Sequence, residues 1–362
     1  MPRAAILNNF LSTFGGGEKN TYAVANTLSR LGYEVDVLTF EERVPQRDEV
    51  VSFFGPGHDG FRILSLAEPG LAPADRDERL TRFLRPHTLF LNQCAGSSFA
   101  NPCPLGVYLV MFPFQDAGPW TATYHHFVCN SRFTEFYVQQ RWGRDLATDV
   151  IYPPVDEPAA DPDAPRAKEI LAIGRFVWEG HTKNQDLLVR AFDEALDRLP
   201  EGWSLTLLGK VHADAATRSR VEELRRACRR LPVRFELNAS NEQKRAALGR
   251  AAVFWHGTGL GRAEPDEAGR MEHFGIAVLE AMASGAIPMC YHRGGPREIV
   301  RHGESGFLYR DEAELGGYTE YVAHSPAAAR RLRRCAVERA RLYSRERFDA
   351  ALAAFVSSCV AG

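Results

Sequence analysis

The chain has 362 residues, which is long for a single hydrophobic core and sufficient for two domains. Apolar residues make up 45% of it and charged residues 25%, as in ordinary soluble globular proteins. The formal net charge of −2 gives no electrostatic reason to expect a nucleic acid or an anionic membrane as partner. No stretch approaches the roughly 20 apolar residues that span a bilayer, so we expect no stable membrane anchor.

The seven cysteines are odd in number and scattered, and no two of them form a Cys-x-x-Cys pair. The cysteine pattern therefore favours neither a zinc site nor a disulfide framework. His125, His126 and His256 have no further ligand at metal-binding spacing, so we expect no metal. The first residues lead directly into a strand without an apolar signal core. We expect a cytoplasmic protein with reduced thiols.

The N-terminal half alternates short apolar runs with helical periodicity. The predicted elements in chain order are a strand over residues 4–8, a loop over 12–17, a helix over 18–31, strands over 34–39, 88–91, 106–111 and 127–130, and a helix from Ser131 to about Trp142. A strand–helix–strand start predicts a parallel sheet that binds ligands at the carboxyl ends of its strands.

Residues 152–168 are rich in proline and aspartate and predict an extended linker at the domain boundary. The alternation then restarts, with strands over 170–173, 204–208, 233–237, 252–256 and 287–291 and helices over 185–195 and 217–230. From Pro326 onward the chain is helical, with arginine-rich faces that we expect to be solvated. The predicted fold class is α/β, with two doubly wound domains in tandem and a cleft between them.

Two glutamates, Glu272 and Glu280, flank a predicted helix start near Gly275, and the apolar residues Ile276 and Leu279 follow at helical spacing. Unpaired amides and the positive end of the dipole make a helix start an anion site, best suited to a diphosphate. A carboxylate cannot bind the phosphate, but it accepts hydrogen bonds from sugar hydroxyls. Taken alone, two such glutamates are more often a solvated helix face than a binding site.

Basic and glycine-rich segments follow other predicted strands. Gly174-Arg175-Phe176 and Lys183 are suited to neutralise one diphosphate, although an isolated basic pair is by default exposed and without function. His256 ends a strand, where it either holds a hydroxyl or caps the following turn. Gly15-Gly16-Gly17-Glu18-Lys19 lets the backbone approach a ligand, but it matches neither a P-loop nor a dinucleotide fingerprint, and a plain tight turn is nearly as good an interpretation.

Taken together, these motifs resemble the GT-B glycosyltransferases, and within them the large retaining family four, particularly its mannosyltransferase-like members. The segments that carry the resemblance, in the family's order, are Gly15 to Lys19, Asn130 to Thr134, Ile151 to Asp156, Gly174 to Phe176, Lys183-Asn184, Glu272 to Glu280, Gly294-Gly295 with Glu298 to Val300, and Gly303 to Leu308. They are distributed over nearly the whole chain.

The resemblance implies a GT-B fold of two Rossmann-like domains that face an interdomain cleft. It places an acceptor-side domain over 1–155, a nucleotide-sugar-binding domain over 165–340, and a helix over 341–362 that crosses back to the first domain. It implies a hexosyltransferase that moves a hexose from a UDP- or GDP-sugar to an acceptor by front-face attack, with retention of configuration. We expect no cofactor besides this co-substrate, no metal, no nucleic acid, and a soluble small acceptor.

The resemblance also assigns roles to single residues. Arg175 and Lys183 would hold the donor's diphosphate and stabilise the charge that develops as the nucleotide leaves, and Glu272 would bind hydroxyls of the donor sugar. These three are the predicted catalytic residues. The predicted donor-binding residues are Gly16, Gly17, Gly174, His256, Phe274, Gly275, Ile276 and Glu280, the last of which would hold the ribose.

One position departs from the family pattern. Many relatives have a histidine near the sugar where this chain has Phe112, which cannot donate a hydrogen bond, and Gln115 and Asp116 are candidates to replace it. Two other kinds of protein are weighed against the transferase. A sugar-nucleotide epimerase or hydrolase of the same fold needs an acid–base set that faces the sugar. A non-catalytic nucleotide-sugar binder should have lost Arg175, Lys183 or a glutamate.

Overall fold

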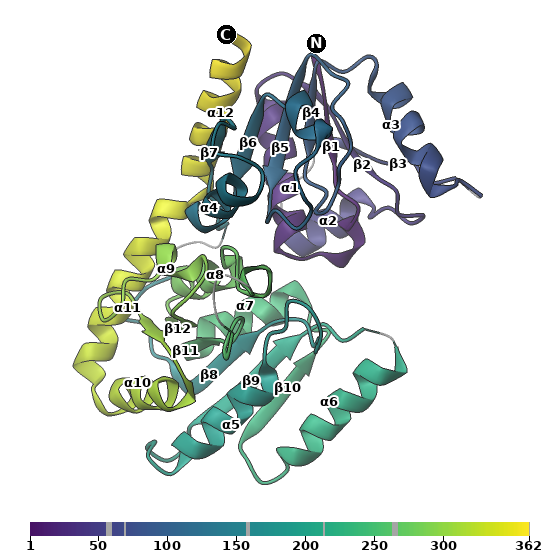
Figure 1. The fold of residues 1–362 in the computed structure, drawn as a ribbon. Coiled ribbons are helices and arrows are strands. Elements are labelled where there is room, and N and C mark those ends of the chain that lie inside the picture. Colours follow the sequence, from purple (N-terminus) through teal and green to yellow (C-terminus); the bar gives the residue numbers. More distant parts are fainter. Residues whose placement is uncertain (56–59, 69, 157–159, 213, 263–266, 362) are drawn as a thin grey trace. The chain divides into compact units, whose positions relative to one another are not determined.

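The computed structural model describes residues 1–55, 60–68, 70–156, 160–212, 214–262 and 267–361. The chain divides into two compact units, of which the first comprises Met1–Pro154 and Arg345–Gly362 and the second comprises Val155–Ser344. Each unit is a parallel sheet with helices on it (Figure 1). The predicted α/β fold class is confirmed.

The described part of the first unit holds a seven-stranded parallel sheet in the order β3-β2-β1-β4-β5-β6-β7. Its strands are β1 (Arg3–Leu7), β2 (Glu34–Thr39), β3 (Arg62–Ser65), β4 (Leu89–Asn92), β5 (Leu105–Val110), β6 (His126–Cys129) and β7 (Thr148–Val150). Because β1 lies between β2 and β4, the chain changes direction across the sheet at β1, and the loop after β1 is at a ligand-binding position of such folds.

Helices cover both faces of this sheet, because its central strands carry apolar side chains on both sides. The helices are α1 (Gly16–Arg30), α2 (Arg47–Phe54), α3 (Arg76–Leu84), α4 (Arg132–Arg141) and the C-terminal α12 (Arg345–Ala361). Apolar residues of α1, α2 and α12 pack on one face, whereas those of α3 and α4 pack on the other. Asp349 ties α12 to α1, because its carboxylate accepts from Thr27 Oγ1 at 2.6 Å and pairs with Arg30 at 2.7 Å.

The described part of the second unit holds a six-stranded parallel sheet in the order β10-β9-β8-β11-β12-β13. Its strands are β8 (Ala167–Ile173), β9 (Ser204–Gly209), β10 (Val233–Leu237), β11 (Ala251–His256), β12 (Ile287–Tyr291) and β13 (Phe307–Tyr309). Its helices are α5 (Gln185–Leu196), α6 (Ala215–Ala227), α7 (Asn241–Arg250), α8 (Ile276–Ala283), α9 (Pro296–Ile299), α10 (Glu312–His324) and α11 (Pro326–Ala340).

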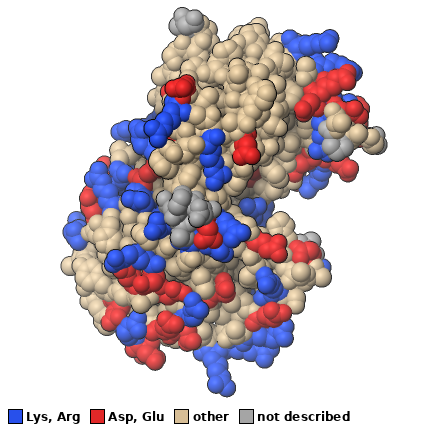
Figure 2. All heavy atoms as spheres, viewed as in Figure 1, with Lys and Arg blue, Asp and Glu red and all other residues tan. Residues whose placement is uncertain are grey.

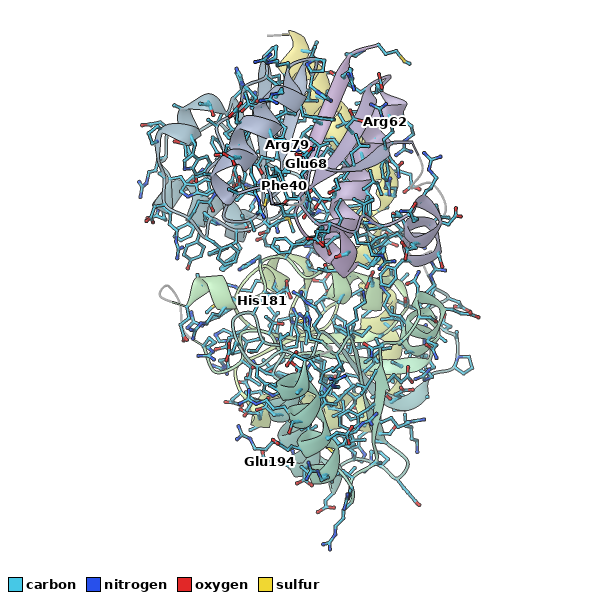
Figure 3. The ribbon with its side chains drawn as sticks, turned by 90° about the vertical axis from the view of Figure 1, so that its right-hand side faces the viewer. Phe40, Arg62, Glu68, Arg79, His181 and Glu194 are labelled. Carbon is cyan, nitrogen blue, oxygen red and sulfur yellow. The ribbon has the colours of Figure 1, made fainter. Side chains whose placement is uncertain are left out.

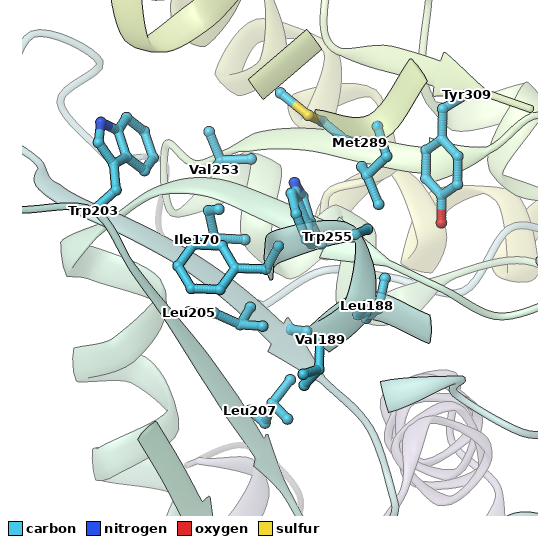
Figure 4. Close-up of a cluster of buried hydrophobic side chains, with 14 of the residues drawn as sticks. Ile170, Leu188, Val189, Trp203, Leu205, Leu207, Val253, Trp255, Met289 and Tyr309 are labelled. Carbon is cyan, nitrogen blue, oxygen red and sulfur yellow. The ribbon is translucent and has the colours of Figure 1, made fainter. Parts of the chain in front are cut away.

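The core of the second unit forms around Trp255 of β11, which is fully buried (Figure 4). Ile170 and Leu205 come from neighbouring strands, while Leu188 and Val189 come from α5. The indole Nε1 of Trp255 donates to Thr319 Oγ1 at 3.0 Å, so this large side chain is buried without an unsatisfied polar atom. The core thereby fixes the two central strands, β8 and β11, whose carboxyl ends carry predicted site residues.

Some elements differ from their predicted bounds. The strands over 34–39 and 287–291 have the predicted limits, whereas α1 begins at Gly16, two residues before its predicted start. The edge strands β3 and β7 had no apolar run to indicate them, because they are only partly buried. Of the predicted linker over 152–168, the last two residues belong to β8, and 157–159 lie outside the described residues.

The surface carries charges of both signs. On the face shown in Figure 2, basic and acidic side chains are interspersed over the second unit, while the first unit shows broader uncharged areas. Among the described residues, no helix combines the length and the apolar character needed to cross a membrane.

We predict that Leu352→Ala lowers the free energy of unfolding of the first unit by about 2–5 kcal/mol, because the leucine of α12 is 1% exposed and its loss leaves a cavity. Urea unfolding measures the change. Val360→Ala, at a 65% exposed position of the same helix, is the control and should change stability by less than about 0.5 kcal/mol. Equal effects of the two substitutions would contradict the packing of α12 in this core.

Candidate functional site

The loop after β8 places a lysine against a glycine. The stem of Lys183 packs where a side chain on Gly174 would lie, since a Cβ there would overlap the Lys183 side chain. Gln185 holds the start of the loop, because its Nε2 donates to the carbonyls of Gly174 at 3.2 Å and of Arg175 at 3.1 Å. The guanidinium of Arg175 is exposed and has no hydrogen bond or ion pair within the described residues. It is therefore open to an anionic ligand.

Glu272 lies between two donors. Lys183 Nζ donates to Glu272 Oε2 at 2.9 Å, and His256 Nε2 lies 3.0 Å from the same oxygen. Only 19% of the lysine side chain and 15% of the glutamate side chain are exposed. Burial by itself raises the pKa of Glu272, but the charge of Lys183 and the hydrogen bond from His256 outweigh it and hold that pKa well below its ordinary value. Glu272 is thus a carboxylate anion that accepts hydrogen bonds.

Two further histidines lie next to this pair. His181 Nε2 is 2.6 Å from the carbonyl of Met271, and the His181 ring stacks on the His273 ring with centroids 5.2 Å apart. Burial, aided by the charge of Lys183, lowers the pKa of His181 to about 3, and burial lowers the pKa of His273 to about 4. Both rings are neutral near pH 7. His181 precedes α5, and Glu194 lies near the far end of that helix (Figure 3).

A glycine turn after β12 holds the backbone that carries Glu272. Gly295 N donates to the Glu272 carbonyl at 2.8 Å, and a Cβ on Gly295 would overlap the backbone of His273 and Phe274. Gly294 has a φ of 76°, which glycine adopts without strain, and a Cβ there would overlap the Glu272 carbonyl. Only residues without a side chain allow this close approach.

Helix α8 begins directly after this backbone. Its N-cap is Gly275, with a φ of 115° and no side-chain capping hydrogen bond, so no side chain caps the first amides of the helix. Phe274 is buried before the helix, and Ile276 opens it. Glu280 lies inside α8 at 4% exposure, and its Oε1 accepts from Lys244 Nζ of α7 at 2.8 Å. The second glutamate of the motif is therefore also paired with a lysine.

Gly16 and Gly17 belong to the first unit, whereas every other predicted site residue belongs to the second. They open α1, and a Cβ on Gly17 would meet nothing within 4 Å. Gln93, which follows β4, donates from Nε2 to the Gly17 carbonyl at 2.8 Å and so ties the helix start to the sheet edge. The first turn of α1 thus has open space at Gly17 and a carbonyl held by Gln93.

The departure from the family pattern at Phe112 is accommodated by aromatic packing. Phe112 is 2% exposed, with the Arg141 guanidinium 5.4 Å from its ring centroid. Gln115 uses its Nε2 within the first unit, donating to the Ser97 carbonyl at 2.9 Å and to Tyr108 Oη at 3.0 Å. Of the two candidate replacements, Asp116 is the exposed one.

Four residues of these clusters were not predicted from the sequence, namely His181, His273, Lys244 and Gln93. Lys244 lies 36 residues from its partner, and α7, which carries it, had not been predicted. His181 lies only two residues before Lys183, but its contact with Met271 is 90 residues distant. Among the described residues, no group of three or more His, Cys, Asp or Glu side chains is arranged to hold a metal ion.

Residues 157–339 match the family described as Glycosyl transferases group 1. A GDP-Man:Man(3)GlcNAc(2)-PP-Dol alpha-1,2-mannosyltransferase of Dictyostelium discoideum is 32% identical over 53% of this chain and 38% of its own length. The Homo sapiens protein of the same description is 29% identical over 56% of this chain and 42% of its own length. The matched part thus spans about two fifths of the length of these relatives.

The fold is that of solved GT-B glycosyltransferases. A glycosyltransferase from Rickettsia africae matches with a TM-score of 0.74 and 14% identity over 99% of both chains. Anabaena HepE in complex with UDP and glucose matches with a TM-score of 0.73 and 18% identity, over 99% of this chain and all of that one. The predicted GT-B fold of two Rossmann-like parts is confirmed.

We predict that the chain loses stability as the pH falls from 6.5 toward 4. The unfolded chain binds protons at histidines near pH 6.5, whereas folded His181 and His273 bind them only near pH 3 and 4. Each should contribute a slope of up to about 1.4 kcal/mol per pH unit in that interval. Urea unfolding at pH 7.0, 5.5 and 4.5 measures the slope. His181→Gln should make it shallower, and an unchanged slope would contradict the assignment.

We predict that Gly295→Ala lowers the free energy of unfolding by about 1–3 kcal/mol, because the added methyl group overlaps the backbone of His273 and Phe274. Gly249→Ala in α7 is the control, since a Cβ there meets nothing within 4 Å, and it should leave stability unchanged or raise it by about 1 kcal/mol. Chemical denaturation distinguishes the two, and a neutral Gly295→Ala would show that the turn does not hold the Glu272 backbone tightly.

Proposed function

Because the chain belongs to the Glycosyl transferases group 1 family, we propose that it transfers a hexose from a nucleotide-diphosphate donor to an acceptor hydroxyl. The reaction would retain the anomeric configuration and would not need a divalent metal. The observation that carries this proposal is the Glu272 carboxylate, held ionised by Lys183 and His256 beside the start of α8. These contacts support the proposal, because an ionised carboxylate would accept hydrogen bonds from sugar hydroxyls and a helix start would suit a diphosphate.

Two cations would act on the diphosphate. Lys183 uses one proton of its ammonium on Glu272 and has two left to donate. Arg175 has its whole guanidinium available for a bidentate contact with phosphate oxygens. Both would stabilise the negative charge that grows on the diphosphate as the bond to the sugar breaks. The amides at Phe274, Gly275 and Ile276 would add to this at the start of α8.

The remaining predicted residues would position the donor. Glu280 would accept hydrogen bonds from the ribose hydroxyls, while Lys244 holds its Oε1. Gly174 allows Lys183 to approach, and the donor-binding roles of Gly16 and Gly17 stay predictions. Neither Glu280 nor Lys244 has to change its protonation state to make these contacts.

Glu272 is poorly suited to act as a general base. Its pKa is held well below the ordinary value, so it takes up a proton too weakly to remove one from an acceptor hydroxyl. In front-face attack the departing phosphate oxygen of the donor takes this proton instead. The acceptor oxygen then bonds to the sugar on the side from which the diphosphate leaves, which retains the configuration.

The relatives point to a first donor for the assay. Both named relatives are GDP-mannose-dependent mannosyltransferases by description, so we propose GDP-mannose before UDP-sugars. Their described acceptor is a glycan on a lipid carrier. A soluble small acceptor and a cytoplasmic location stay predictions for this chain. A non-catalytic binder is disfavoured, because Arg175, Lys183, Glu272 and Glu280 are all present.

We predict that the wild-type chain releases GDP from GDP-mannose in the presence of EDTA. If the donor is another nucleotide sugar, the chain should release the corresponding nucleoside diphosphate under the same conditions. Lys183→Met should lower the rate by about 100- to 1000-fold, because a group that stabilises the developing charge is lost. Glu272→Gln should lower it as well, because an amide cannot replace both the anion and its acceptor geometry. A coupled assay for the released nucleoside diphosphate measures the rates of the wild type and of the two variants.

Matched controls separate these effects from general damage to the fold. Lys168→Met removes a lysine whose Nζ donates to the Glu201 carbonyl, and Glu304→Gln changes an exposed glutamate that is paired with Arg301. Both should keep the wild-type rate. Absence of release from any GDP-, UDP-, ADP- or dTDP-sugar by the wild-type chain would overturn the proposed function.

A further inference from the structure

The two oxygens of the Glu272 carboxylate have different surroundings. Lys183 Nζ and His256 Nε2 both lie within 3.0 Å of Oε2. No described residue donates a hydrogen bond to Oε1. A carboxylate oxygen accepts more than one hydrogen bond, so two donors on one oxygen leave the whole acceptor capacity of the other in place. The carboxylate is held by one oxygen and open at the other.

His256 is not free to turn toward a ligand. It ends β11 and is 3% exposed, and its backbone carbonyl accepts from Tyr309 Oη at 2.8 Å. Because an ionised carboxylate only accepts, His256 Nε2 must carry the ring proton and donate it. The other ring nitrogen, Nδ1, is buried and has no hydrogen-bond partner in the described structure. Burial lowers the pKa of His256, so the ring is neutral and Nδ1 carries no proton.

We propose that His256 is a positioning residue that fixes the rotamer of Glu272 by its Nε2–H bond and thereby presents Glu272 Oε1 to the donor sugar. This inference rests on the proposed function. Lys183 alone does not fix the carboxylate, because its flexible stem and rotatable ammonium allow many geometries. The imidazole is planar, buried and attached to a central strand, so it defines the direction of the bond that it donates.

The free acceptor capacity of Glu272 Oε1 determines which sugar substituent can bind there. Lys183 and His256 both donate to Oε2, and the ionised Oε1 can only accept a hydrogen bond. The sugar group opposite Oε1 must therefore donate one. A free hydroxyl fits this requirement. A deoxy or O-methylated sugar at that position lacks the donor, and a carboxylate there, as in a uronic acid, is repelled. The site therefore takes a neutral hexose with that hydroxyl unsubstituted.

Two substitutions of His256 form a matched pair. Gln places its side-chain Nε2 close to the position of the imidazole Nε2 and preserves the donor. Asn is shorter, and its nitrogen corresponds to the buried Nδ1, so it does not reach Glu272. His324→Asn, at the exposed end of α10, is the external control and should change neither affinity below.

Calorimetry measures the affinity for GDP-mannose and, separately, for GDP, which lacks the sugar. His256→Gln should bind GDP-mannose within about 3-fold of the wild type, and His256→Asn should bind it at least 10-fold more weakly. In His256→Asn the loss of affinity should be larger for GDP-mannose than for GDP, because Oε1 contacts only the sugar. Equal losses of GDP-mannose affinity in the two variants, or equal losses for GDP-mannose and GDP in His256→Asn, would overturn the positioning role.

The pH profile of transfer gives a second readout. Glu272 faces Lys183 and His181 from the loop after β8, His273 beside it in the chain and Cys290 from β12, and none of these groups changes in the variants. In His256→Asn the acidic limb should move to higher pH, because a donor that lowers the pKa of Glu272 is lost. An unmoved limb would overturn the proposal.

A crystal structure of His256→Asn tests the role without any donor. The Glu272 side chain should leave the rotamer in which Oε2 meets Lys183, and an unchanged carboxylate would overturn the proposal. A wild-type chain that binds no nucleotide sugar would instead overturn the proposed function, and the carboxylate position in the variant would still decide the role of His256.

Discussion

The second unit is organised around a carboxylate that has lost most of its water but keeps its charge. A buried glutamate without partners becomes neutral, because desolvation disfavours the anion. Lys183 and His256 prevent this in Glu272 by placing a cation and a neutral donor on one oxygen. The other features of the site follow from that requirement, since the lysine, the histidine and the glutamate must be brought together from three segments.

The sheet order makes this meeting possible. Strand β8 lies between β9 and β11, so the loop that carries Lys183 and the strand end that carries His256 emerge side by side at one sheet edge. Glycines then remove the side chains that would keep these segments apart, at Gly174 under the lysine stem and at Gly294 and Gly295 under the Glu272 backbone. The buried core around Trp255 anchors both strands, so the geometry rests on packing.

The three histidines around Glu272 are uncharged. His181, His256 and His273 are all held neutral, since burial outweighs the attraction of the nearby Glu272 anion and Lys183 adds to the repulsion. A neutral imidazole has one donor and one acceptor, so each ring has a defined direction at neutral pH. Among the described residues, this centre combines the Glu272 anion and the Lys183 cation with three neutral imidazoles. In the proposed reaction, Lys183, Arg175 and the start of α8 would together meet the negative charge of the diphosphate.

Much of the second unit was accessible from sequence because its signals are local. Strand β12 has the predicted limits, and the Glu272–Glu280 helix begins at Ile276 as its apolar spacing indicates. Elements whose pattern is weak escaped prediction, among them the edge strands β3 and β7, which are only partly buried, and α7, whose exposed surface has few apolar residues. The residues of the motifs were identified, but their partners were not.

The sequence by itself determined the alternation of strands and helices, the glycines at strand ends, and the presence of an arginine, a lysine and two glutamates with the family's spacing. The sequence determines these features because each of them can be recognised from a short stretch of consecutive residues. Only the tertiary structure decided that Lys183 pairs with Glu272 across 89 positions, that Lys244 pairs with Glu280, and that His256 shares an oxygen with the lysine. Such pairs depend on which strands lie side by side and on how deeply a charge is buried. Those are properties of the packed chain, and no local spacing encodes them.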